Sequence, residues 1–258
     1  MIDWMMSAEV FDRWYTDRDG SPLVDELMAR MLGLPAGVES TGMLGGAGLD
    51  EVVTALRLSS GDVLLDLACG RGGLGREIAR RTGCGLVGVD FSAVAIEQAR
   101  QRGGDFRVGS LTATGLAPAS VDAVLVVDSV QFAESKPDAL RECRRVLRPG
   151  GRLVVTGWQA VDPADTSIWG PIRELDLARQ LPEAGFTGVE VRDRPEWRAA
   201  EKRLWEEALT LEAPDDPAVV SLQGEARSVL STFDGKRRVL ATAHVSGSAP
   251  ACRASAPA

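Results

Sequence analysis

The fold is decided by the stretch Val63-Leu64-Leu65-Asp66-Leu67-Ala68-Cys69-Gly70-Arg71-Gly72-Gly73-Leu74-Gly75. Its apolar run, 63–67, predicts a buried parallel strand. The run ends in a carboxylate and a glycine-rich turn, and a helical pattern follows, with Leu74, Ile78 and Ala79 on one face. Glycines let a backbone approach a ligand closely, and the free N–H groups of a helix start attract negative charge. The stretch therefore predicts a strand, turn and helix that bind a nucleotide-like ligand.

A second acidic residue follows the next expected strand. The run 86–89 is apolar and ends in Asp90, twenty residues after Gly70. A carboxylate at this position is suited to accept hydrogen bonds from ribose hydroxyls. We therefore expect Asp66 and Asp90 to hold opposite ends of one ligand.

Composition and charge narrow the function. The chain has 258 residues, of which 45% are hydrophobic, and its formal net charge is −8. This length favours one main domain with appendages. The charge argues against nucleic acid and against an anionic membrane as partners, because there is no basic excess to neutralise phosphates.

Cysteine usage and the termini indicate a compartment. The four cysteines (Cys69, Cys84, Cys143, Cys252) are far apart and there is one histidine, which predicts neither a metal site nor a disulfide framework. The acidic N-terminal segment does not resemble a signal peptide, and no apolar run reaches the ~20 residues that span a bilayer. The expected location is the cytoplasm.

Strand and helix patterns alternate along most of the chain. Alternation of this kind predicts an α/β fold, a Rossmann-like doubly wound sheet with helices on both faces. Two helices before the last strand allow that strand to enter antiparallel, which makes the sheet seven-stranded. The expected strands are 63–67, 85–90, 105–109, 121–127, 152–156, 186–191 and 237–245, and the expected helices 73–82, 92–102, 135–148, 171–184, 195–211 and 217–230.

The pattern divides the chain into three parts. Residues 1–60 look helical, with one helix at 22–32 behind the N-cap Ser21 and another at 49–58, and are expected to cover the ligand as a lid. The alternative is that their aromatic residues only pad the edge of the core. Residues 61–245 form the main domain, and the Ser/Ala/Pro-rich residues 246–258 are expected to be disordered.

Five short motifs together resemble the class I S-adenosylmethionine-dependent methyltransferases. The resemblance is strong over about residues 60–160, and over 186–245 it rests on element order alone. It is closest to the small-molecule enzymes of bacterial secondary metabolism. The motifs are Leu65-Asp66-Leu67-Ala68-Cys69-Gly70-Arg71-Gly72, Gly88-Val89-Asp90-Phe91-Ser92, Val108-Gly109-Ser110-Leu111, Val127-Asp128-Ser129-Val130-Gln131-Phe132 and Arg145-Val146-Leu147-Arg148-Pro149-Gly150-Gly151-Arg152-Leu153.

The resemblance implies how S-adenosylmethionine is bound and released as S-adenosylhomocysteine. Asp66 would hold the methionine part, together with the backbone of Ala68, Gly70 and Gly72. Asp90 would hold the ribose.

The resemblance places the rest of the cofactor as well. Phe91 would lie against the adenine, Ser110 and Leu111 would flank its edge, and Asp128 would lie under the sulfonium. Two positions depart from the family: Ala68 replaces a usual glycine, and Ser110 replaces a common aspartate.

Catalytic groups are sparse. Gln131 stands where relatives often place a histidine base, so it would position the acceptor rather than deprotonate it, and Asp128 is the other candidate. The single histidine, His244, is expected to be structural. Alignment of the acceptor with the sulfonium can supply most of the acceleration. This favours a carboxylate, an acidic phenol, an amine or a stabilised carbanion as acceptor.

Four aromatic residues are candidates for the wall of the acceptor pocket, with core packing as the alternative for each. Trp158 follows the fifth strand, at the edge where open α/β sheets bind ligands. Trp14 and Tyr15 belong to the expected lid, and Trp169 follows the fifth strand at a distance.

The leading hypothesis is methyl transfer to the O, N or C atom of a small molecule, such as a natural-product intermediate. An alternative is a protein that keeps the cofactor but catalyses a pericyclic or decarboxylating reaction, or only binds. A third, nicotinamide binding, rests on the match of residues 70–75 to GxGxxG. The tetrapeptide (N/D)PP(Y/F) of DNA and protein aminomethyltransferases is missing after the fourth strand, which disfavours a macromolecular acceptor.

Overall fold

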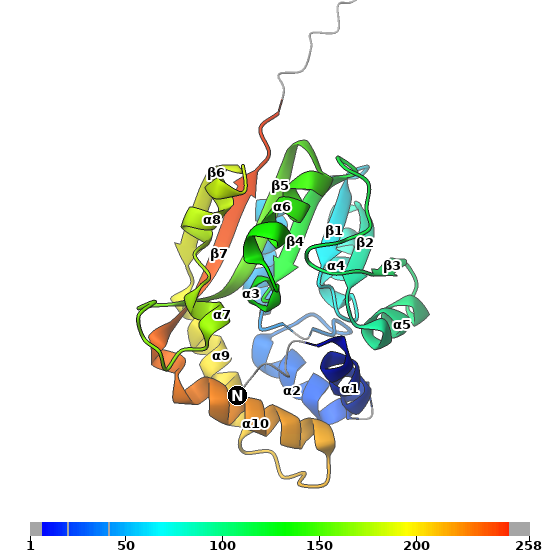
Figure 1. The fold of residues 1–258 in the computed structure, drawn as a ribbon. Coiled ribbons are helices and arrows are strands. Elements are labelled where there is room, and N and C mark those ends of the chain that lie inside the picture. Colours follow the sequence, from blue (N-terminus) through cyan, green and yellow to red (C-terminus); the bar gives the residue numbers. More distant parts are fainter. Residues whose placement is uncertain (1–6, 20, 41, 248–258) are drawn as a thin grey trace, which may run out of the picture.

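The computed structural model describes residues 7–19, 21–40 and 42–247, and its centre is one sheet of seven strands (Figure 1). The strands are β1 (Val63–Leu67), β2 (Gly85–Asp90), β3 (Asp105–Val108), β4 (Val121–Val127), β5 (Leu147–Ala160), β6 (Thr187–Asp193) and β7 (Lys236–His244). The helices are α1 (Ala8–Asp19), α2 (Pro22–Leu32), α3 (Gly46–Leu56), α4 (Gly73–Thr82), α5 (Ala93–Gln101), α6 (Lys136–Val146), α7 (Gly170–Arg173), α8 (Leu177–Glu183), α9 (Pro195–Ala208) and α10 (Pro217–Ser231), with the short 3₁₀ segments η2 (Val130–Phe132) and η3 (Phe233–Gly235).

The strand order is β3-β2-β1-β4-β5-β7-β6. The first five strands are parallel, and β7 runs antiparallel between β5 and β6. This confirms the predicted doubly wound sheet with its antiparallel last strand. The order reverses between β1 and β4, and in such sheets ligands bind at the carboxyl ends of the strands beside that reversal.

Alternate residues of the central strands build two separate cores. Leu65 and Leu67 of β1 face one side and join α6 and α8 in one cluster. Leu64 faces the other side and packs with α3, α4 and Trp197 of α9. The period of two follows from strand geometry, because successive side chains point to opposite faces.

The predicted boundaries agree with the structure around the organising stretch and depart from it further on. β1, α4 and β2 begin and end at the expected residues, whereas the expected helix 171–184 is split into α7 and α8. The break comes before Asp176, whose side chain accepts the N–H of Arg179 and so starts a new helix. β5 is longer than predicted because β7 pairs with it as far as Ala160.

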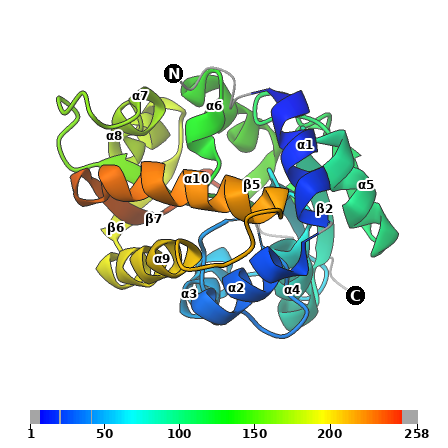
Figure 2. The same ribbon diagram turned by 90° about the horizontal axis from the view of Figure 1, so that it is seen from below.

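A third apolar cluster forms a cap over the carboxyl ends of the strands. It joins α2, α9 and α10, and Trp158 of β5 and Phe233 of η3 complete it. Figures 1 and 2 show α1, α2, α9 and α10 gathered below the sheet, with α10 crossing between α9 and α1. The cap is therefore built from both ends of the chain, and we use the term for these four helices.

Residues 248–258 of the expected tail lie outside the described residues. Within the described ranges, no helix is long and apolar enough to cross a bilayer.

Candidate functional site

The glycine-rich turn after β1 has three residues in the left-handed region. Ala68 has a φ of 60°, Gly70 of 53° and Gly72 of 74°. Glycine adopts this conformation freely, but it costs an L-residue about 1–2 kcal/mol. At Ala68 the departure from the family glycine therefore strains the backbone, which is a different cost from the small steric intrusion of a methyl group.

Asp66 lies under this turn. Its carboxylate is 3% exposed and accepts the N–H of Gly75, in the first turn of α4, at 3.1 Å. Burial raises the pKa of Asp66 to about 7, the neighbouring Asp90 adds to the rise, and the Gly75 N–H opposes it. A Cβ at Gly75 would lie 2.5 Å from Oδ2 of Asp66, so this contact requires glycine.

Asp90 joins the ends of β1 and β2. One carboxylate oxygen accepts the N–H of Gly70 at 2.8 Å, and the other accepts the N–H of Ser92 at 2.9 Å. The side chain is 4% exposed, and burial raises its pKa. The structure thus brings Asp90, which is expected to bind the ribose, and the turn that is expected to bind the methionine part together at one corner of the sheet.

Of the residues expected around the adenine, Phe91 contacts α1. The Phe91 ring is 5.1 Å from that of Phe11 of α1, in an edge-to-face contact. The hydroxyl of Ser110 lies 3.2 Å from that of Thr112, and Leu111 is half-buried against the core. The strand-end loops and α1 therefore enclose the same corner.

Asp12 fastens α1 to this corner. Its carboxylate accepts the hydroxyl of Ser92 at 2.5 Å and the N–H of Val94 at 3.2 Å, at the start of α5. A carboxylate is favourable at a helix N-terminus, where the backbone N–H groups lack partners. This contact was not foreseen, because it joins segments eighty residues apart.

Asp128 follows β4, and both oxygens of its carboxylate accept hydrogen bonds. Arg238 of β7 donates two hydrogen bonds to its carboxylate, at 2.7 and 3.0 Å. The Thr156 hydroxyl and the Met43 N–H donate at 2.8 Å each. Asp128 has a φ of 53°, so its backbone is also held in the left-handed region. These donors occupy both oxygens of the carboxylate.

Gln131 lies directly beside Asp128. Its Nε2 donates to the Asp128 carbonyl at 2.6 Å, while its buried Oε1 has no hydrogen-bond partner among the described residues. His244 is opposite Arg152, at the start of β5, and so lies at the other end of the sheet. Of the two catalytic candidates, Gln131 is the one with a free acceptor atom.

Two of the four candidate pocket aromatics lie at the ends of one row of rings. Trp14 is 6.4 Å from Phe11, which is 5.8 Å from Phe132, which is 5.5 Å from Trp169. Tyr15 is buried beside Trp14.

Trp158 lies apart from this row. It is 7% exposed and packs on Phe233 within the cap, with the Arg238 guanidinium 5.3 Å from its ring. The structure thus places the aromatic candidates in two separate groups.

Charged residues that were not predicted surround the corner. Arg71 of the turn and Arg18 of α1 both bind Asp25 of α2, and Arg238 lies between Asp128 and Glu201 of α9. Arg71 stands inside the glycine-rich motif itself, and Arg238 shares a strand face with Leu240. A charge at an inward strand position was the available signal for Arg238.

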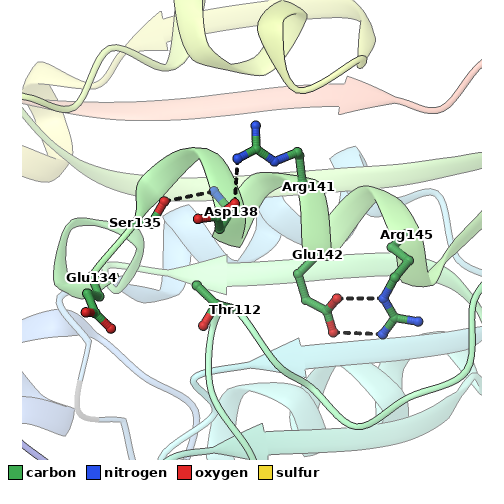
Figure 3. A pocket seen from close by; sticks show the side chains of 7 residues that line it. All are labelled: Thr112, Glu134, Ser135, Asp138, Arg141, Glu142 and Arg145. Carbon is green, nitrogen blue, oxygen red and sulfur yellow. Dashed lines mark hydrogen bonds and ion pairs between the residues drawn. The ribbon is translucent and has the colours of Figure 1, made fainter.

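Described residues line one hollow at α6 and another at the glycine-rich turn. The larger one, of about 650 Å³, lies between α6 and the loop at Thr112 (Figure 3). Its arginines are paired within α6, Arg141 with Asp138 and Arg145 with Glu142. The smaller one, of about 260 Å³, adjoins Arg71 and Gly73. No group of three or more potential metal-ligating side chains occurs in the described part of the chain.

Residues 65–155 match the family model described as "Methyltransferase domain". The chain is 36% identical to 2-phytyl-1,4-naphtoquinone methyltransferase of Thermosynechococcus vestitus over 107 residues, 39% of this chain and 48% of that protein. It is also 36% identical to malonyl-[acyl-carrier protein] O-methyltransferase of Enterobacter lignolyticus over 134 residues, 49% of this chain and 53% of that protein. The chain thus spans about half the length of these curated relatives.

A solved structure shares most of the fold. The structure of the [4+2]-cyclase SpnF superposes with a TM-score of 0.66 at 23% identity, covering 88% of this chain and 93% of SpnF. At this identity the likeness concerns the fold alone.

Proposed function

We propose that this chain, whose central domain belongs to the class I S-adenosylmethionine-dependent methyltransferase family, transfers a methyl group from S-adenosylmethionine to a small organic acceptor. The observation that carries the proposal is the corner formed by the turn at residues 68–72 and Asp90. There the backbone can approach a ligand closely, the first turn of α4 begins, and a carboxylate lies beside it.

The residues at this corner fit an adenosyl amino acid. The turn from Ala68 to Gly72 would follow the methionine part, and Asp90 keeps further lone pairs that can accept ribose hydroxyls. Phe91 offers a ring face to the adenine, with Ser110 and Leu111 at its edge. Asp66, which is paired with Gly75, supports the turn from below.

The cofactor supplies an activated methyl group on a sulfonium. The chain's own contribution would be orientation and the exclusion of water. Gln131 presents its free Oε1 to a donor group of the acceptor, and its Nε2 bond to the Asp128 carbonyl fixes the amide. The row of rings from Trp14 to Trp169 would wall the acceptor from solvent. Alignment of this kind can supply about 7–11 kcal/mol of the barrier.

A small acceptor agrees with the charge and with the cap. The net charge of −8 disfavours a nucleic acid, and the cap covers the edge of the sheet that a macromolecular acceptor would need to reach. We propose that the acceptor is a natural-product intermediate that is methylated on O, N or C. An acceptor of low proton affinity would need no general base, which suits a site where Arg238 occupies the Asp128 carboxylate.

Calorimetry with S-adenosylhomocysteine tests whether the protein binds the cofactor at all. The wild-type protein should bind it with a dissociation constant in the micromolar range, about −8 kcal/mol. Phe91→Ala should weaken binding roughly tenfold, because it removes the ring expected against the adenine, whereas Val108→Ala on the exposed edge of β3 should not. A wild-type protein without affinity for S-adenosylmethionine or S-adenosylhomocysteine would refute it.

A second candidate is a cofactor-bound catalyst of a pericyclic or decarboxylating reaction. What favours it is the engaged Asp128, together with a fold shared with a [4+2]-cyclase over most of the chain. Incubation with methyl-labelled cofactor and acceptor separates the two functions. Label in the product supports methyl transfer, and an unlabelled, rearranged product supports the second.

A further inference from the structure

Two buried arginines share one carboxylate where the cap meets the glycine-rich turn. Arg18 of α1 donates to Asp25 of α2 at 2.6 Å, and Arg71 of the turn donates to the same carboxylate at 2.7 and 2.8 Å. Both arginine side chains are 3% exposed. A buried guanidinium needs a partner for its charge and for each N–H group.

The partners present do not satisfy this pair. Within the part of the chain that the structure describes, the Nε atoms of Arg18 and Arg71 have no hydrogen-bond partner. Glu39 lies 3.3 Å from Arg71 but also binds Arg102 at 2.8 Å. The side of the site next to the turn therefore carries a surplus of positive charge and free donors, which suit a carboxylate.

Glu225 lies on α10, which packs against α1, the helix that carries Arg18. It shares the inward helical face of Ala218 and Leu222, and no hydrogen bond or ion pair joins it to another described residue. Burial raises its pKa, and Arg18 is the one charged group that opposes the rise. Yet the side chain keeps some accessible surface, and it does not form an ion pair with Arg18.

We propose that these groups clamp the amino-acid end of S-adenosylmethionine between the turn and the cap, with Arg18 and Arg71 binding its carboxylate and Glu225 binding its ammonium group. The inference rests on the proposed function and extends it. A zwitterion supplies the anion that the arginines lack and the cation that Glu225 lacks, so the net charge is unchanged. Arg71 lies between Gly70 and Gly72, which places the clamp at the methionine end of the turn.

The assignment gives the cap a direct part in cofactor binding. Arg18 comes from α1 and Glu225 from α10, and both lie outside residues 65–155 of the family model. The methyltransferase domain would hold the adenosine, and the cap would close on the other end. Cofactor affinity should therefore depend on residues that the shared motifs do not contain.

Three ligands separate the groups by calorimetry. S-adenosylhomocysteine has both charges, its deamino analogue keeps only the carboxylate, and 5′-methylthioadenosine has neither. Glu225→Gln should weaken the binding of S-adenosylhomocysteine at least tenfold. It should leave the dissociation constants of the other two ligands within twofold of the wild-type values. Arg18→Gln should weaken S-adenosylhomocysteine and the deamino analogue about tenfold, and again spare 5′-methylthioadenosine.

Glu206→Gln is the matched control, because it removes the same charge from an exposed position on α9. Thermal unfolding of each variant verifies its folding, and Arg18→Lys replaces Arg18→Gln if the latter unfolds. Equal affinity of S-adenosylhomocysteine for wild type and Glu225→Gln would overturn the clamp. So would an equal loss for 5′-methylthioadenosine, which would show a general effect on the site. A wild-type protein that binds none of the three refutes the proposed function itself.

Discussion

At the scale of single residues, the corner of the sheet keeps its shape through groups that are costly to bury. Asp66 and Asp90 are both almost inaccessible to solvent, and each accepts a hydrogen bond from a backbone N–H group of the turn or helix beside it. Buried carboxylates of this kind fix the geometry of the site, but their burial lowers the free energy of unfolding of the protein. Their titration and their backbone strain are therefore measurable.

Asp66→Asn should change how stability depends on pH. In the wild type the folded protein keeps a proton on Asp66 up to about pH 7, whereas the unfolded chain loses it near the ordinary value of 3.8. The folded state binds the extra proton, so its free energy of unfolding falls as the pH rises through this window. At about 1.4 kcal/mol for each pKa unit, the fall is up to about 4 kcal/mol.

Urea denaturation at about pH 5 and about pH 8 measures the effect. The Asp66→Asn side chain keeps an acceptor for the Gly75 N–H but cannot ionise, so the variant should lose less stability between the two pH values. Asp193→Asn, at an exposed position of β6, should behave as the wild type. A parallel pH dependence for Asp66→Asn and wild type would contradict the expectation.

Ala68 is the residue whose substitution tests backbone strain. Ala68→Gly should change the free energy of unfolding by no more than about 1 kcal/mol, because relief of the left-handed conformation is offset by the larger entropy of the unfolded chain. Ala68→Val should lose about 2 kcal/mol or more, since a β-branched residue tolerates this region poorly. Urea titration of the three proteins decides it, and equal stability of Ala68→Val would argue against strain at this position.

At the scale of elements, two polar contacts hold pieces together that are distant in the sequence. Asp12 joins α1 to α5, and Arg238 joins β7 to the end of β4 and, through Asp128, to Met43. Both contacts lie at the edge of the sheet where ligands are expected. Each can be removed without touching the hydrophobic cores.

Asp12→Ala should release α1. The change removes a cap from the start of α5, worth about 1 kcal/mol, and leaves Ser92 to cap α5 alone. Amide hydrogen exchange should become faster in α1, while β4 and β5 keep their protection. Asp17→Ala in the same helix is the control, and unchanged exchange in α1 would show that its aromatic contacts suffice.

Arg238→Met alone should strongly lower the free energy of unfolding, and it should lower it less when it is combined with Asp128→Asn. It leaves the Asp128 carboxylate buried beside Glu201 with its main partner gone, which costs about 3–5 kcal/mol. Asp128→Asn together with Arg238→Met removes both charges, so the double variant should be more stable than the sum of the single losses predicts. A double-mutant cycle by urea denaturation measures this coupling, and simple additivity would contradict it.

Elements were predictable where the local pattern decides them. The apolar run 63–67 and the glycines after it set β1 and α4 by themselves, and Ser135 caps α6 as its position before Pro137 suggested. The break between α7 and α8 was not predictable, because the segment reads as helical on both sides of Asp176. The extension of β5 comes from its partner β7, which is more than seventy residues away.

The site was predictable to a similar extent. The motif residues cluster as expected, because they follow neighbouring strands whose ends meet at one edge. What the sequence could not indicate is which distant groups contact them. Arg238 and Asp12 reach the corner through tertiary packing, and no local spacing records those contacts.

At the scale of the whole molecule, the cap is one unit made from two ends of the chain. Val24 and Met28 of α2 pack against Leu204 and Trp205 of α9, and α10 closes the same cluster. A unit of this kind should open as a whole. Its stability then depends on contacts between residues nearly two hundred positions apart.

Leu204→Ala tests this cooperation. The lost packing should cost about 2–5 kcal/mol, and hydrogen exchange should become faster in α2 and α10 as well as in α9. Leu140→Ala in the core on the face of α6 should destabilise the protein without this selective effect on α2. Exchange that increases in α9 alone would show that the cap is not one unit.

The two-ended construction also has a consequence during synthesis. While the ribosome is still adding residues up to about 231, the first helices have emerged, but α9 and α10, which cover their apolar side, have not. Val24, Leu27 and Met28 therefore face water, or a chaperone, until α9 and α10 have emerged. The cap can close only after α10 has left the ribosome, so a chain whose synthesis stalls before α10 carries the ligand-binding turn without the helices that cover it.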